Sequence, residues 1–148
     1  MFNLVYRDGA PENTGHYENW ETDGTTDLAV GTLVSVSGGK AAAYSVGMPY
    51  GMVAIGTKDE NTPSGDVYDH VGVLKIDSDM IFRTSPGDPA VVVKLVKGNI
   101  VSVNKSTVSY TEPVAAGFEI TDVISAGRVI GGTTLVGCVV EGRFVKID

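Results

Sequence analysis

The side chains that could bind a metal are few and widely spaced in this chain. It contains two histidines, His16 and His70, and one cysteine, Cys138. None of them stands in an HxH, HExxH or CxxC spacing. The acidic stretch from Asp66 to Asp79 lacks the residue order of an EF-hand loop, so we interpret Asp77-Ser78-Asp79 as a turn between strands. The sequence therefore predicts no metal site and no cofactor.

Catalytic nucleophiles are equally hard to place. His70 could act as a general base, but no GxSxG or comparable serine motif accompanies it. Cys138 has apolar neighbours and no adjacent base, which predicts a buried structural thiol. Gly38-Gly39-Lys40 lacks the spacing of a phosphate loop. We predict no catalytic residues and no enzymatic activity. The alternative is a small β-barrel enzyme or ligand-binding module, with a pocket that joins His70 to Asp66 or Asp69.

Length and charge restrict the partners. The chain has 148 residues, the size of one ordinary domain, and a net charge of -7. Residues 1 to 27 carry six acidic side chains and one basic side chain, so the negative charge is concentrated there. Phosphate backbones and anionic lipids repel such a protein. We therefore expect neither nucleic acid nor membrane as a partner, and we expect a protein partner instead.

Short valine-rich segments separated by glycine dominate the chain after residue 27. Valine, isoleucine and threonine favour extended backbone, and no window shows a convincing helical stripe. The pattern predicts an all-β protein, a single small β-barrel or β-sandwich-like domain over residues 27–148. The expected strands are Thr32–Ser37, Ala41–Val46, Met52–Thr57, Val67–Ile76, Met80–Thr84, Ala90–Val96, Ile100–Asn104, Phe118–Ile124, Thr134–Val140 and Arg143–Ile147.

Three glycine-containing joins read as tight turns, and one strand looks unusual. Ser37-Gly38-Gly39-Lys40, Lys97-Gly98-Asn99 and Glu141-Gly142-Arg143 each place glycine where a hairpin needs positive φ. The expected strand at 91–96 is apolar on nearly both faces, as in a strand buried between two layers or inside an oligomer. We therefore predict that Val91, Val93 and Leu95 lie at a subunit interface.

Residues 1–26 differ from the remainder in being polar and without sustained periodicity. They predict an extended acidic N-terminal arm. Tyr6, Tyr17 and Trp20 interrupt it and are the candidate anchors of the arm on a partner. Two interpretations of Trp20 remain open. It either packs back on its own domain or anchors the arm on a partner.

Glycine and proline separate the short segments Gly31–Val36, Gly38–Ala43 and Gly51–Thr57, and in this pattern the sequence resembles the capsid decoration, or cement, proteins of tailed bacteriophages. Those proteins open with a glycine before an apolar strand, followed by a Gly turn, a small-residue strand, a proline and a Gly-Val-Ala-like strand. The corresponding residues here are Gly31–Val36, Gly38–Ala43, Pro49 and Gly51–Thr57, and Leu135–Gly137 to Arg143–Val145 is similar to the closing strands. The acidic arm and residues 58–69 are not covered by this resemblance.

The resemblance implies a non-enzymatic viral structural protein that binds the outer surface of an assembled phage capsid and stabilises it. Its partners would be the major capsid protein and two further copies of itself in a homotrimer. The N-terminal arm, with Tyr6, Tyr17 and Trp20 as anchors, would then be a capsid-binding arm. It would be made in the host cytoplasm and located on the outer capsid surface of the virion. A phage tail, baseplate or fibre-associated structural protein is the alternative, because it would share the composition and the β content.

Overall fold

The computed structural model describes residues 1–7 and 17–147. It is all-β as predicted, with 51% of the residues in strands and 4% in helix. The elements are β1 (Phe2–Arg7), β2 (Tyr17–Glu21), β3 (Leu33–Ser37), β4 (Lys40–Ala43), β5 (Gly51–Ile55), β6 (His70–Lys75), β7 (Met80–Thr84), the 3-10 helix η1 (Pro89–Lys94), β8 (Ile100–Asn104), β9 (Thr107–Ser109), β10 (Ala116–Ile130) and β11 (Thr134–Lys146).

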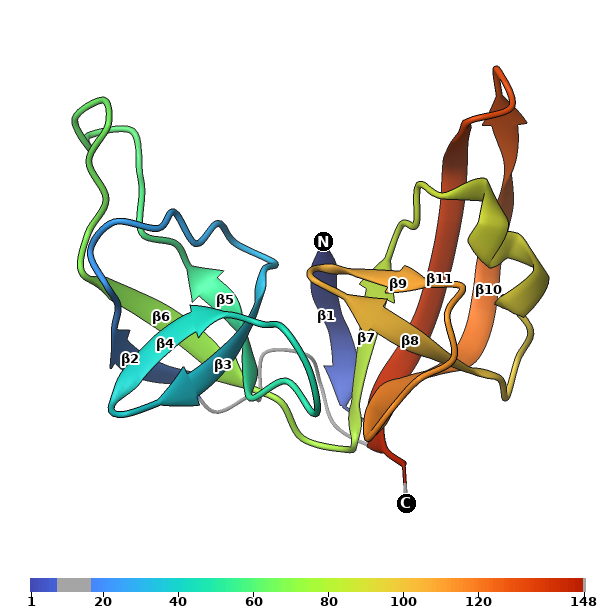
Figure 1. Ribbon diagram of the computed structural model, residues 1–148, viewed down its shortest axis with the longest axis horizontal. Helices are drawn as coiled ribbons and strands as arrows, with labels where there is room; N and C mark the ends of the chain where they lie inside the picture. Colours follow the sequence, from blue (N-terminus) through green and yellow to red (C-terminus); the bar gives the residue numbers. More distant parts are fainter. Residues whose placement is uncertain (8–16, 148) are drawn as a thin grey trace.

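The strands form a small barrel and a second sheet, which Figure 1 shows side by side. The barrel has the order β2-β4-β3-β5-β6 and closes through a parallel contact of β2 with β4. The six-stranded sheet has the order β1-β7-β11-β10-β8-β9. Strands β1 and β7 pair with each other in the six-stranded sheet, and all five barrel strands lie between them in the sequence.

Barrel strands are buried on both faces where the second sheet covers them. Side chains alternate between the faces of a strand, so neighbouring residues belong to different clusters. One cluster fills the barrel and the other joins the barrel to the second sheet. Val34, Val53 and Val73 belong to the cluster that fills the barrel. Their chain neighbours Leu33, Met52 and Leu74 belong to the cluster that joins the barrel to the second sheet. The two sheets therefore share one core and form one unit.

Four phenylalanines occupy the centre of the second sheet. Phe2, Phe82, Phe118 and Phe144 are fully buried. Phe144 lies 5.1 to 5.2 Å from the ring centroids of the other three, with the ring planes tilted or edge to face. Such geometries are the favoured ones for aromatic pairs. The first strand is therefore held by the most buried part of the core.

The expected arm is corrected by this arrangement. Its described parts are β1, which pairs with β7, and β2, which pairs with β6 over its whole length. The boundary predicted after residue 26 thus does not separate an arm from the core. The segment before it lacks hydrophobic periodicity, yet it contributes one strand to each sheet. Residues 8–16 of the predicted arm lie outside the described residues, as does the side chain of Tyr6.

Most of the other expected strands are found, and the structure differs from the expectation at three places. The strand expected at 90–96 is not formed: residues 90–94 belong to η1, because Asp88 accepts a hydrogen bond from the backbone N–H of Ala90 and Pro89 opens the turn. The predicted hairpin at Glu141-Gly142-Arg143 is wrong, since β11 runs straight through it. The short strand β9 was not predicted. The turn at Gly38 and Gly39 is confirmed, with φ of 60° and 80°.

We predict that the N-terminal strand is required for stability. Phe2→Ala should lower the free energy of unfolding by about 3–5 kcal/mol, because it removes a fully buried ring. Asn3→Ala, at an exposed position on the same strand, should change it by less than about 0.5 kcal/mol. Urea unfolding followed by the fluorescence of the single tryptophan measures both. A loss under about 1 kcal/mol in Phe2→Ala would contradict the described core.

Candidate functional site

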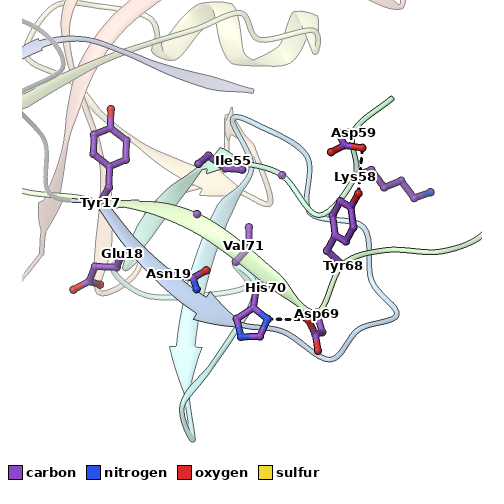
Figure 2. A pocket seen from close by; sticks show the side chains of 12 residues that line it. Tyr17, Glu18, Asn19, Ile55, Lys58, Asp59, Tyr68, Asp69, His70 and Val71 are labelled. Carbon is purple, nitrogen blue, oxygen red and sulfur yellow. Dashed lines mark hydrogen bonds and ion pairs between the residues drawn. The ribbon is translucent and has the colours of Figure 1, made fainter. Parts of the chain in front are cut away.

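A broad hollow lies on the outside of the barrel. It is an open groove of about 680 Å³ over β2, β6 and the end of β5, with one wall from the loop between β5 and β6. Figure 2 shows Tyr17 and Tyr68 at opposite ends with Ile55 between them. These three side chains are 51%, 44% and 69% exposed. The groove therefore combines accessible aromatic and aliphatic surface.

The groove exists because the second sheet covers only part of the barrel's outer face. In the registers of β6 with its neighbours, Gly72 lies opposite Asn19 of β2 and Ile55 of β5. Paired residues share a face, so these three form a row across the sheet. A Cβ atom at Gly72 would lie 2.8 Å from that of Ile55. Glycine at this position is what lets the Ile55 side chain lie across the floor.

The sequence-based alternative of a histidine and carboxylate pocket is partly realised here. His70 Nδ1 lies 2.8 Å from Asp69 Oδ1, and both residues line the groove. The hydrogen bond to His70, with the charge attraction as second cause, holds the pKa of Asp69 below its usual value. Asp66 lines a different hollow, beside Thr62 and Gly65. The structure therefore joins His70 to Asp69 and not to Asp66.

Asp59 fixes the far wall of the groove. Its carboxylate accepts hydrogen bonds from the backbone N–H of Asn61, at 2.8 Å, and from the Tyr68 hydroxyl, at 3.3 Å. The Asn61 bond is the main reason that the pKa of Asp59 is lowered. The backbone N–H of Tyr68 donates to Thr57, at 2.8 Å. The aromatic ring of Tyr68 is thus positioned from both its backbone and its hydroxyl.

Trp20 packs on its own barrel. Its ring meets the ring of Tyr50 edge to face, at 5.5 Å between centroids, and belongs to the rim of the barrel core. The carboxylate of Glu18 accepts hydrogen bonds from Trp20 Nε1 and from the Tyr50 hydroxyl. That second bond is the main cause that raises the pKa of Tyr50 to about 12. Tyr17, the other described anchor candidate, is half exposed at the groove.

The predicted subunit-interface residues do not share one surface. Val91 is fully buried and Leu95 packs partly against the same core, whereas Val93 is 79% exposed. A 3-10 turn separates these side chains, so the two-faced strand on which the prediction rested is not formed. Cys138 is buried as expected, and burial raises the pKa of its thiol.

A second exposed surface was not predicted. Beyond Val123 the paired strands β10 and β11 continue without β7 as a two-stranded projection, called here the ribbon (residues 124–139), which rises at the upper right of Figure 1. Its exposed apolar side chains are Ile124, Val129 and Ile130, each about half exposed. The turn signal Gly131-Gly132 was visible in the sequence, but the glycine at 127 obscured the length of the strand.

No protein-family model, curated protein or solved structure matches this chain. Within residues 1–7 and 17–147, no group of three or more histidine, cysteine or carboxylate side chains is placed to hold a metal ion. The same residues contain no helix with the length and hydropathy of a membrane span.

We predict that Glu18 controls the ionisation of Tyr50. Glu18→Ala should return the pKa of Tyr50 from about 12 towards about 10, because the hydrogen bond that favours the neutral phenol is lost. Since the folded-state pKa is raised, this stabilisation is complete below about pH 10 and disappears as the pH rises through about 12.

Titration of ring-labelled tyrosines by NMR, assigned with Tyr50→Phe, measures this value. Asn19→Ala removes a neighbouring side chain of β2 without touching the hydrogen bond and serves as the control. A Tyr50 that titrates at its ordinary pKa in the unmodified protein would show that the Glu18 contact does not form.

Proposed function

We propose that the chain is a non-enzymatic structural protein of a tailed bacteriophage, a decoration protein that binds the outer surface of the assembled capsid and stabilises it. Its partners are the major capsid protein and two further copies of itself. The support from the sequence is the resemblance described above, whose residues fall on β3, β4 and β5 of the barrel and on β11 of the second sheet.

The ribbon is the observation that carries the proposal. Strand β10 pairs with β8 only at Phe118 and Glu119, so its outer edge from residue 122 onward has no partner strand among the described residues. An unpaired edge with apolar side chains is a template to which another chain can add a strand. Ile124, Val129 and Ile130 give such an interface buried apolar area without opening the core.

Binding at threefold positions explains how weak contacts stabilise a shell. A ligand that binds only the assembled lattice shifts the equilibrium towards that lattice by mass action. Linking three copies makes the second and third contacts intramolecular and multiplies the effect. The net negative charge of the chain keeps it soluble before it docks.

A tail, baseplate or fibre-associated location is the alternative within the same class. The two locations differ in where the protein is found on the virion, so gold labelling of virions of the encoding phage separates them. Label on the shell is expected, and label confined to the tail would overturn the decoration proposal. The groove favours a second candidate, a ligand-binding module, whose chemistry is developed below.

We predict that the ribbon is required for shell binding. Ile124→Ser combined with Val129→Ser should weaken binding to stripped, expanded shells of the encoding phage at least about tenfold, because two aliphatic side chains no longer gain from burial. Co-sedimentation over a range of protein concentrations measures the affinity. Melting temperatures should stay close to that of the unmodified protein, since both side chains are already half exposed.

Val30→Ser combined with Val46→Ser is the matched control. These valines are 56% and 73% exposed and lie outside the ribbon. The control protein should bind like the unmodified one. Equal binding by the ribbon variant and the control would refute the role of the ribbon, and loss in both would place the contact elsewhere.

A further inference from the structure

The groove offers two kinds of surface in one place. Tyr17 and Tyr68 stand at its ends and Ile55 lies along its floor. Between and beside them are polar groups that both donate and accept hydrogen bonds, including the Asn19 amide, the Lys58 ammonium and the His70 imidazole. Aromatic faces combined with mixed donors and acceptors suit a ligand that has apolar faces and a hydroxylated edge.

The carboxylates at the groove already take part in hydrogen bonds within the protein. Asp69 is hydrogen-bonded to His70, and Asp59 accepts hydrogen bonds from Asn61, Thr62 and Tyr68. A cationic ligand would be attracted by these charges but would have to compete with the internal hydrogen bonds, so lysine methyl ester serves below as the probe that tests a cationic ligand.

Phosphate-containing ligands are disfavoured by charge. Asp59 and Asp69 line the groove, and the pKa values of both are lowered, so they stay ionised at neutral pH. Lys58 is the one lysine or arginine among the residues that line the groove. The field of the whole chain, at net charge -7, adds to the repulsion.

We propose that this groove binds a saccharide of one or two rings. The C–H faces of a sugar ring would lie against Tyr17, Tyr68 and Ile55, while its hydroxyl groups exchange hydrogen bonds with the polar side chains. A volume of about 680 Å³ is in the range of small-molecule sites. Tyr68 is already held by Asp59 and by its backbone hydrogen bond to Thr57, so little conformational entropy of its side chain is lost on binding.

This proposal goes beyond the decoration function and does not depend on it. A shell protein with a saccharide site on its exposed side would give the virion a weak, many-copy affinity for glycans, because a shell displays many copies at once. The ribbon and the groove lie on different sheets, so one molecule can use both surfaces.

The experiment is a titration of the isotope-labelled protein, followed by backbone amide NMR. The probes are four disaccharides, cellobiose, maltose, lactose and N,N′-diacetylchitobiose, with inorganic phosphate and lysine methyl ester as chemically different probes. At least one disaccharide should shift the amides of Asn19, Ile55 and Gly72 with a dissociation constant at or below the order of 1 mM. Phosphate and the lysine ester should leave these amides unchanged.

Tyr17→Ala and Tyr68→Ala should each weaken disaccharide binding at least about fivefold, because each removes one aromatic face. Tyr110→Ala is the matched control, since Tyr110 is 49% exposed and follows β9 on the other sheet. The amide spectra themselves report whether each variant is folded.

Four results would overturn the proposal. They are no saturable shift with any of the disaccharides, shifts that lie outside the groove, binding unaffected by both tyrosine substitutions, and saturation by phosphate or the lysine ester instead. Shell binding by Tyr68→Ala should be unchanged, so failure of the saccharide site is distinguishable from failure of the decoration function.

Discussion

Double-sided burial of the barrel strands is the constraint on which the rest of the structure depends. Val73 faces the barrel interior and its neighbour Leu74 faces the second sheet, so neither sheet can leave the other without exposing core. The cover is incomplete, because the outer face becomes glycine and polar residues towards His70. That change in side chains along one strand divides the outer face of the barrel into a packed part and the groove.

The sequence indicated the fold class and most strand positions, and it failed where two rules competed. Residues 91–93 read as a strand by composition, but Asp88 and Pro89 are a helix-start signal and this signal decides the structure. Gly142 read as a turn by type. Its actual role is close approach, since a Cβ atom there would overlap the backbone of Glu119 and the ring of Phe118. A glycine can mark a turn or a place where another chain segment packs closely on the backbone, and a single sequence does not distinguish these two roles.

The candidate site was only partly within reach of the sequence. His70 and Asp69 are adjacent in the chain, so their pairing could be anticipated. Tyr17 and Ile55 reach the same groove from strands far apart in the chain, and only the register of β2 and β5 on β6 brings them there. Periodicity predicts which residues share a face of one strand, but it does not specify which strands become neighbours.

The insertion of the barrel between β1 and β7 has a consequence for the order of folding. Met1 and Thr84, which share a hydrogen bond, are 83 positions apart, whereas the barrel strands and the β10–β11 hairpin close over shorter distances. Long loops are slower to close than short ones, so β1 docks after the barrel has shortened the path between its ends. Until β1 pairs with β7, the place that Phe2 fills in the aromatic cluster is open and its apolar neighbours are exposed.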